Sequence, residues 1–433
     1  MAHTIRILAA LLIAAFFLIS GNGLQGTLLS VRGNMEGFPL VLVGLLMSAY
    51  FAGFIFGCRI APRMVKRVGH IRAFTALASI ASAAALAYAL AVEPVFWLLL
   101  RVVTGFSLAG LYMIIESWIN ETVDNEQRGR TLAVYRLVDL TAATLGQAMI
   151  ALADPTAFTL FAIVSILISL ALVPVAMTTT TQPRPITSAK LDLRKLFRIS
   201  PLAAAGCLAV GVANGAFWAV GAVYVQQLGY DVRTVAVFMT TVVIAGALVQ
   251  WPLGLISDRT DRRIIVTITA GLCSAAGAFL AAAGGVSGQM LLFGAFAFGF
   301  TAMPIFGLCV AHANDRAEPH EYVTLAAGLL LLYGAGAVAG PVIAPLLMNA
   351  FGPSALFIHS SVIYGALVLF GLYRIFVRDP APQSNRESYV SVPRTSPAVF
   401  EFDPRAEPEE NDGDEPVSGN VSTASSPVPG SST

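Results

Sequence analysis

The chain has 433 residues, of which 56% are hydrophobic and only 12% are charged. Soluble domains carry roughly 25% charged residues, so the composition excludes a soluble enzyme and indicates a polytopic membrane protein. The net charge of +1 combines an acidic, proline-rich end beyond Val377 with a basic remainder, and neither part gives reason to expect a nucleic-acid partner.

Twelve apolar stretches follow in chain order, each long enough for a helix to cross the roughly 30 Å hydrocarbon core. We therefore expect an all-α polytopic membrane protein with twelve transmembrane helices. The stretches cover residues 5–29, 39–58, 71–92, 95–118, 130–152, 156–177, 201–224, 234–256, 264–284, 289–311, 323–348 and 354–376. A signal peptide is the alternative for the first stretch, but its length and its Asn22 and Gln25 favour a span.

Lysine and arginine are distributed unevenly between the two sets of predicted loops. One set carries 18 of them, whereas the opposite set carries Arg32 and Arg233. Because basic loops remain in the cytoplasm, we expect both termini to be cytoplasmic.

The two halves of the chain repeat at an offset of about 193 residues. Asn22-Gly23 matches Asn214-Gly215, and Gly105 falls on Gly299. We expect an N-terminal six-helix bundle over 1–177, a cytoplasmic linker over 178–200, a C-terminal six-helix bundle over 201–376 and a disordered acidic cytoplasmic tail over 377–433. This architecture resembles that of the major facilitator superfamily, a family of secondary transporters with parallel repeats.

The sharpest motif lies between the eighth and ninth predicted spans and resembles the superfamily's loop signature Gly-x-x-x-Asp-Arg-x-x-Arg-Arg. We assign a gating role to its members, which are Gly254, Asp258, Arg259, Arg262 and Arg263. A helix start attracts a carboxylate, so our hypothesis is a latch from Asp258 to residues 128–131 that stabilises the outward-facing state. A basic turn with one helix-ending aspartate is the alternative.

Four charged residues of the fourth and fifth spans are candidates for coupling. Arg101 and Gly105 resemble the Arg-x-x-x-Gly motif, whose arginine is associated with proton coupling in many members of the superfamily. Arg101 shares a helical stripe with Tyr112 and Glu116, and Arg136 lies three residues before Asp139. A charge inside the bilayer is costly, which makes Asp139 our first choice of protonatable group. A structural anchor at Arg101 and a static Arg136–Asp139 pair are the alternatives.

Two further groups of residues complete the candidate site. Gly336, Gly340 and Pro341 resemble the Gly-x-x-x-Gly-Pro motif of antiporters and are assigned to gating, although that motif normally belongs to the fifth span. In the superfamily the first and seventh spans line the substrate cavity, which implies that polar residues of these spans face the substrate here. The alternative is that these residues only form ordinary hydrogen bonds between helices. The candidate cavity residues are Asn22, Gln25, Tyr50, Tyr112, Asn214, Trp218, Tyr224 and Gln250.

Segments such as Arg67-Val-Gly-His-Ile-Arg72 and Gln250-Trp251-Pro252 resemble the YcaD-like branch of bacterial transporters. The resemblance implies a secondary active transporter. We expect it to move a small organic solute across the inner membrane by alternating access with proton coupling, with export favoured and proton symport uptake of a metabolite as the alternative. We expect a monomer in the lipid bilayer, without a cofactor or a metal.

The alternative from another functional class is a membrane sensor that kept the fold and lost transport. For the tail, the sequence leaves open a regulatory docking segment or a dispensable solvated terminus.

Overall fold

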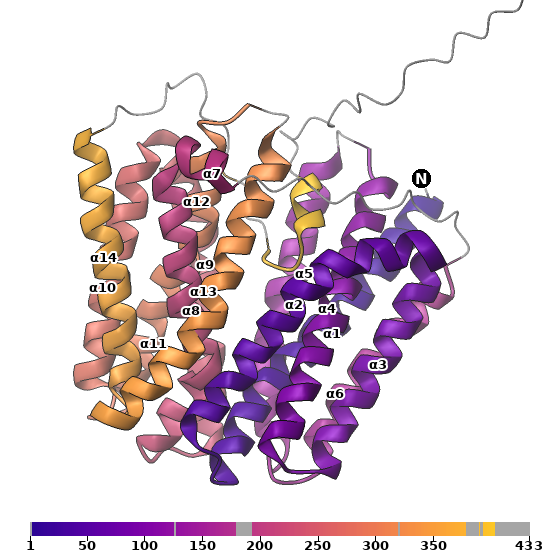
Figure 1. Cartoon of the computed structure of the whole chain (residues 1–433), viewed down its shortest axis with the longest axis horizontal. Helices are drawn as coiled ribbons and strands as arrows, with labels where there is room; N and C mark the ends of the chain where they lie inside the picture. Colours follow the sequence, from indigo (N-terminus) through magenta and orange to yellow (C-terminus); the bar gives the residue numbers. More distant parts are fainter. Residues whose placement is uncertain are drawn as a thin grey trace, which may run out of the picture.

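The structure is a computed structural model, which describes residues 2–124, 127–178, 193–318, 321–377, 389 and 393–402. These residues form helices and turns, with no strand among them (Figure 1). The first half contains α1 Ala2–Met35, α2 Leu40–Val68, α3 His70–Leu90, α4 Pro94–Thr122, α5 Arg128–Ala148, the 3-10 helix η2 Met149–Leu152 and α6 Thr159–Ala176.

The second half begins with a short helix in the predicted linker, α7 Leu193–Ile199. It continues with α8 Pro201–Gln227, α9 Val232–Arg259, α10 Arg262–Ala283, α11 Gly288–Ala302, α12 Ile305–Asn314, α13 Tyr322–Phe351 and α14 Ala355–Val377. A short 3-10 helix, η5 Pro397–Phe402, follows in the C-terminal tail.

Every predicted span is helical in the structure, and ten of the twelve correspond to one α-helix each. Eleven helical stretches of the described chain are long and apolar enough to cross a membrane. The remaining predicted span is the fifth, α5, which carries Arg136 and Asp139 and packs against α1 and α9. Large apolar side chains such as Leu137, Val362 and Leu369 are exposed on the outside of the bundle, as contact with lipid requires.

Local chemistry explains several helix boundaries. The Glu93 carboxylate caps the start of α4, and Asp231 and Ser287 cap α9 and α11 in the same way. The tenth predicted span is divided into α11 and α12 at Met303 and Pro304. Proline has no backbone N–H to donate, which accounts for the break.

The internal repeat is visible in the packing of the helices. A Cβ atom on Gly105 of α4 would overlap the carbonyl of Tyr50 in α2, and a Cβ atom on Gly299 of α11 would overlap the carbonyl of Val242 in α9. Both glycines allow two helix backbones to touch. The matching positions in the two halves therefore make matching contacts.

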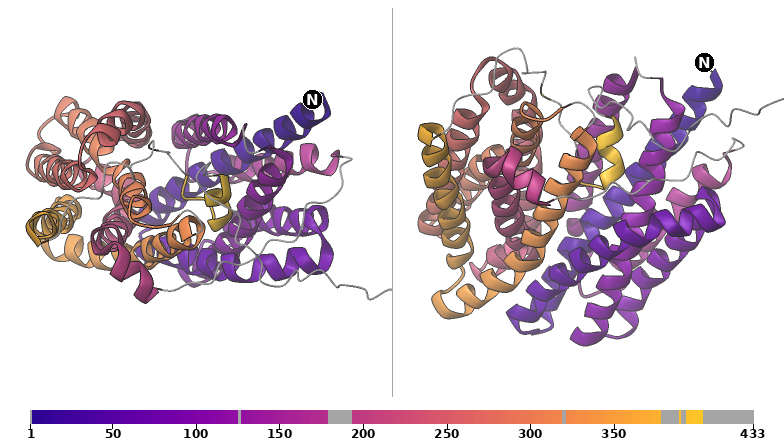
Figure 2. Two further views of the ribbon diagram at one scale, coloured as in Figure 1. Left: turned by 90° about the horizontal axis from the view of Figure 1, so that it is seen from above. Right: turned by 45° about the horizontal axis from the view of Figure 1, so that its top comes forward.

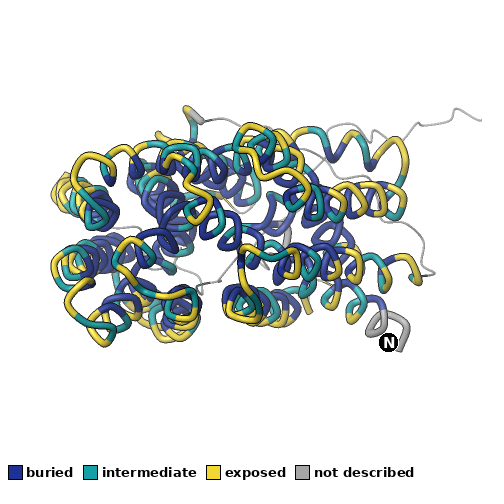
Figure 3. The backbone as a smooth tube through the Cα atoms, turned by 90° about the horizontal axis from the view of Figure 1, so that it is seen from below, coloured by how far each residue is buried: buried dark blue, intermediate teal, exposed yellow. Residues whose placement is uncertain are grey.

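Both ends of the bundle-forming chain lie on one side, the upper side of Figure 1, together with α7. We call this the terminal side and the other the opposite side. On the opposite side the halves contact each other directly, because Ser48 Oγ donates to the Val338 carbonyl at 2.7 Å and Asn34 Nδ2 donates to Gln226 Oε1 at 3.1 Å. The tube view from below shows the buried residues gathered in the interior of the bundle (Figure 3).

Part of the tail differs from the predicted disorder. Residues 393–402, which we call the C-terminal segment, lie between the halves on the terminal side (Figure 2), and Ser396, Val399 and Phe400 are buried. The composition of the whole tail is acidic and rich in proline, but this stretch contains apolar and hydroxyl side chains that the bundle can bury. The other residues of the predicted tail, except Val377 and Tyr389, lie outside the described residues.

Candidate transport site

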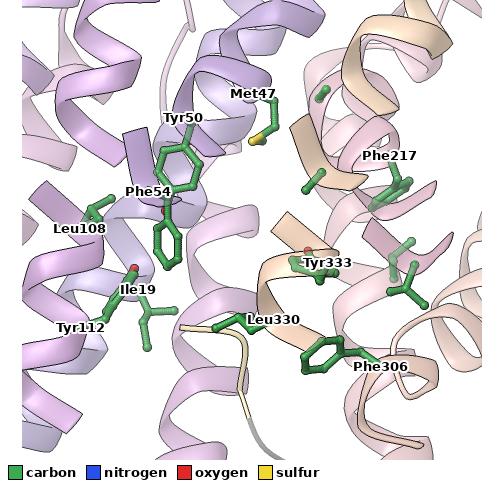
Figure 4. Close-up of a cluster of buried hydrophobic side chains, with 14 of the residues drawn as sticks. Ile19, Met47, Tyr50, Phe54, Leu108, Tyr112, Phe217, Phe306, Leu330 and Tyr333 are labelled. Atoms are coloured by element: carbon green, nitrogen blue, oxygen red, sulfur yellow. The ribbon is translucent and has the colours of Figure 1, made fainter. Parts of the chain in front are cut away.

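A cavity of about 240 Å³ lies between the two halves and is lined by residues of both. The first half contributes a polar and charged wall, and the second contributes aromatic, amide and methionine side chains. Figure 4 shows Tyr50, Phe54 and Tyr112 on one side of the gap, with Tyr333 and Phe306 on the other. The predicted residues that line it are Asn22, Tyr50, Arg101, Tyr112, Arg136, Asp139, Trp218 and Gln250.

Arg101 is almost fully buried and lies at the wall of the cavity. Its guanidinium stacks over the Tyr50 ring at 4.6 Å, and its Nε donates to the Leu46 carbonyl at 3.3 Å. The Nη1 atom has no hydrogen-bond partner among the described residues. A buried cation with an unused donor can accept a polar group of a solute or water in the cavity.

Arg136 connects an acid of its own helix to an amide of the second half. It forms an ion pair with Asp139 in α5, and its Nε donates to Oε1 of Gln250 in α9 at 3.1 Å. The amide of Gln250 in turn donates to the Gly246 carbonyl at 3.2 Å. The predicted pair of Arg136 and Asp139 is therefore connected directly to the second half.

Glu116 is fully buried in α4 beside the cavity. Tyr135 donates to its carboxylate at 2.7 Å, and Thr395 and Ser396 of the C-terminal segment also donate to it. The structure therefore surrounds this carboxylate with three hydroxyl groups.

Three predicted cavity residues do not line the cavity. Gln25 is buried within the first half, and its amide has no hydrogen-bond partner among the described residues. Asn214 accepts a hydrogen bond from Tyr364 at 3.1 Å, and Tyr224 donates to the Leu280 carbonyl at 2.8 Å. Asn214 and Tyr224 thus form hydrogen bonds between helices of the second half, which was the alternative to a cavity role.

The loop signature forms a network with residues of the second half and of the tail. Asp258 accepts from Arg262 at 2.9 Å and from the backbone N–H of Tyr389 at 2.7 Å, whereas our latch hypothesis had expected contact with residues 128–131. Arg262 also binds Asp315 at 2.8 Å. The terminal sides of the halves are separated here by the C-terminal segment, so a latch between them is not formed in this conformation.

Asp261 lies between α9 and α10, where its carboxylate caps α10 and pairs with Arg263 at 2.6 Å. Burial raises the pKa of Asp261, but the hydrogen bonds and charge of Arg263 outweigh burial and hold this pKa below its ordinary value. Arg259 is exposed at the end of α9.

The Gly-x-x-x-Gly pair of α13 lies against α8. Cβ atoms on Gly336 and Gly340 would overlap backbone atoms of Leu208 and Val212. The carbonyl of Pro341, the next residue, lies against Gly44 of α2 on the opposite side of the molecule. The motif therefore borders both the interior of the second half and the contact between the halves.

Several residues that line the cavity were not predicted from the sequence. Met47, Phe51 and Phe54 of α2 are on the same face as Tyr50, and Tyr333 of α13 faces them, with its ring 6.1 Å from that of Phe51. Their spacing of three and four residues is a helical stripe that could have been found. Arg394 and Thr395 of the tail also line the cavity, and no periodic pattern marks them.

Comparisons with known proteins agree with this arrangement. The family model of the Major Facilitator Superfamily matches residues 11–332 and 244–401. An uncharacterized MFS-type transporter of Enterobacter sp. (strain 638) is 26% identical over 325 residues, covering 75% of this chain and 84% of that protein. YcaD of Salmonella heidelberg (strain SL476), also an uncharacterized MFS-type transporter, is 26% identical over 326 residues, covering 74% and 83%.

Solved structures with the same fold include the nucleoside transporter NupG, with a TM-score of 0.75, 12% identity and coverage of 86% of this chain and 100% of that one. The D-xylose-proton symporter has a TM-score of 0.68 and 15% identity, with coverage of 89% and 99%. At these identities the likeness concerns the fold alone.

Proposed function

The chain belongs to the Major Facilitator Superfamily, and from this premise we propose that it moves a small organic solute across the bacterial inner membrane by alternating access. The observation that carries this proposal is the cavity between the halves, which is lined with charged and aromatic side chains while the halves touch on the opposite side. Rocking of two bodies about such a cavity would expose it to one compartment at a time.

The rocking bodies in this proposal are residues 1–177 and 201–376, connected by the linker 178–200. The terminal side is cytoplasmic, with both termini in the cytoplasm, because it carries most of the basic residues outside the hydrophobic stretches. The conformation described here is then open toward the cytoplasm, apart from the C-terminal segment.

Spin labels on each side of the molecule test alternating access without knowledge of the solute. The terminal-side pair is Gln127→Cys with Arg259→Cys, and the opposite-side pair is Glu36→Cys with Arg233→Cys. A transporter should show two distance populations at each pair, with the terminal pair shortening when the opposite pair lengthens. One unchanging distance at both pairs, in the presence and absence of a pH gradient, would favour a sensor that does not transport.

We further propose that protons drive solute export and that Asp139 carries the proton. Its carboxylate lies in the cavity wall and is paired with Arg136, so protonation would release the guanidinium. The aromatic, amide and methionine side chains of the wall suit an amphipathic solute.

Proteoliposomes that enclose a pH-sensitive dye test proton coupling with a panel of cationic, neutral and anionic aromatic solutes. At least one solute should change the internal pH, and Asp139→Asn should remove this response. Asp154→Asn is the matched control, because Asp154 is exposed in a loop of the opposite side. An Asp139→Asn variant with an unchanged response would exclude this residue as the proton carrier.

A further inference from the structure

The C-terminal segment fills the space between the halves on the terminal side (Figure 2). Its helix η5 packs against α4 and α5 of the first half and against α13 of the second. Val399 is 0% exposed and Phe400 is 2% exposed. Burial this complete is typical of a docked element rather than a solvated terminus.

The bundle offers the segment specific polar partners. Thr395 and Ser396 donate to the two carboxylate oxygens of Glu116, which itself is inaccessible to solvent. Without the segment, Glu116 would lose two of its three observed donors and keep Tyr135. A buried carboxylate needs several donors, so the segment completes this site.

Tyr389, which precedes the segment, packs against two glycines of the second half. A Cβ atom on Gly254 would lie 2.6 Å from the Tyr389 ring, and one on Gly307 would overlap its hydroxyl. The backbone N–H of Tyr389 donates to Asp258 at 2.7 Å. The signature loop therefore holds the chain that leads to the C-terminal segment.

Arg394 projects from the segment into the cavity. Its guanidinium lies over the rings of Tyr333 at 5.0 Å and Phe306 at 5.7 Å, and it contacts the sulfur of Met303 at 3.8 Å. Asp139 lines the same cavity and attracts this cation. Two aromatic faces, a soft sulfur and a carboxylate are the groups that recognise an organic cation.

The contacts of Arg394 are also incomplete. Its Nη1 atom has no hydrogen-bond partner among the described residues, and its guanidinium makes no ion pair of hydrogen-bonding length with a described carboxylate. Arginine has five N–H donors, and donor atoms that are buried, as Nη1 of Arg394 is, usually have a hydrogen-bond partner. A cation that fits this site with fewer unsatisfied donors could therefore replace it.

We propose that the C-terminal segment is a tethered occupant of the transport cavity, in which Arg394 fills a site for an organic cation. This inference rests on the proposed transport function and names the chemical class of its solute. Closure of the terminal side would require the segment to leave, because it lies where the halves must meet. A cationic solute that displaces Arg394 would then both load the cavity and free the halves to move.

Maleimide labelling of a cysteine in the segment tests the docking. Val399→Cys, with Cys58→Ser to remove the partly exposed native thiol, places a thiol smaller than valine at a fully buried position. We expect the full-length protein to label at least about tenfold more slowly than the same protein unfolded in detergent. Ala398→Cys serves as a second position. Equal labelling rates in folded and unfolded protein at both positions would overturn the inference without touching the proposed alternating access.

The same thiol reports the cation site when benzamidine, benzamide and benzoate are compared. These probes are cationic, neutral and anionic analogues of similar shape. Benzamidine should accelerate labelling about threefold or more, and the other two should leave it unchanged. Arg394→Ala should accelerate labelling without any probe, whereas the exposed Arg198→Ala should not. Protection that responds to none of the probes, or equally to all three, would refute the assignment of an organic-cation site.

Discussion

Replacing Gly146 by alanine tests the close contact that holds α5, with Arg136 and Asp139, against α1. A Cβ atom at this position would lie 2.6 Å from the Ser20 carbonyl oxygen and 3.2 Å from both the Gly23 Cα and the Leu24 nitrogen. All three neighbours are backbone atoms, so no side chain can turn away. Since ordinary contact begins at 3.4 Å, the two helices must separate by about 0.8 Å, the difference between 3.4 and 2.6 Å.

The size of the effect follows from two opposing contributions. Forcing extra volume into a packed contact costs about 1–3 kcal/mol, whereas alanine stabilises a helix interior by about 0.5–1 kcal/mol relative to glycine. Gly146→Ala should therefore lower the free energy of unfolding by up to about 2.5 kcal/mol. Gly271→Ala is the matched control, because its Cβ would lie 3.7 Å from a Val368 methyl group and should keep the favourable contribution alone.

Thermal unfolding of the purified variants in one detergent, followed by circular dichroism, measures the two effects side by side. The midpoint should fall for Gly146→Ala and should stay unchanged or rise for Gly271→Ala. The proton response in proteoliposomes should also weaken in Gly146→Ala, because α5 is displaced from α1. Equal midpoint shifts of the same sign in both variants would refute the argument that backbone contact at Gly146 positions α5.

Asp261→Asn should lower the unfolding midpoint at neutral pH. In the folded protein the pKa of Asp261 lies below its ordinary value. The ionised carboxylate therefore stabilises the fold above the ordinary pKa, and this stabilisation is lost as the pH falls through the folded pKa. A difference in unfolding midpoint between variant and parent that stays constant down to about pH 3 would contradict this. Phe400→Ala removes an apolar burial of about 1.5–3 kcal/mol and should accelerate labelling of the C-terminal segment by at least about tenfold, whereas Phe376→Ala, at an 85% exposed position, should leave the rate unchanged. Ser48→Ala removes a hydrogen bond between the halves to Val338, worth about 1 kcal/mol. It should increase the long-distance population of the opposite-side spin-label pair, and an unaltered distribution would show that this bond does not hold the halves together.

The fold could be predicted because hydropathy and helix length are local properties. Each apolar stretch had to become a helix to satisfy its backbone in lipid, and the repeat that relates Gly105 to Gly299 indicated how the helices pair. The break at Pro304 and the continuation of α2 to Val68 were not predicted. The basic residues after position 58 mark where the chain meets water, but a helix can continue past that boundary.

The site was predicted less completely, because a helix has several faces and composition does not say which one meets the cavity. The charged residues Arg101, Arg136 and Asp139 were found because an ionised group inside the bundle needs a cavity or a partner. Asn214 and Tyr224 carry no charge, and each forms a hydrogen bond within its own half instead of lining the cavity.

The docked C-terminal segment could not be predicted, since its burial depends on a surface created by helices distant in sequence. Thr395 and Ser396 are ordinary tail residues until the structure places the Glu116 carboxylate beside them. The acidic and proline-rich composition is an average over the whole tail, and it gives no sign of the short stretch that the bundle buries.

The guanidinium of Arg136 is shared between an acid in its own half and an amide of the other half. A change in the ion pair between Arg136 and Asp139, such as protonation of Asp139, therefore also changes the hydrogen bond between Arg136 and Gln250. By thermodynamic reciprocity, separating α5 from α9 must alter the proton affinity of that acid to the same degree. The side chain of Arg136 thus couples the protonation of Asp139 to the contact between α5 and α9.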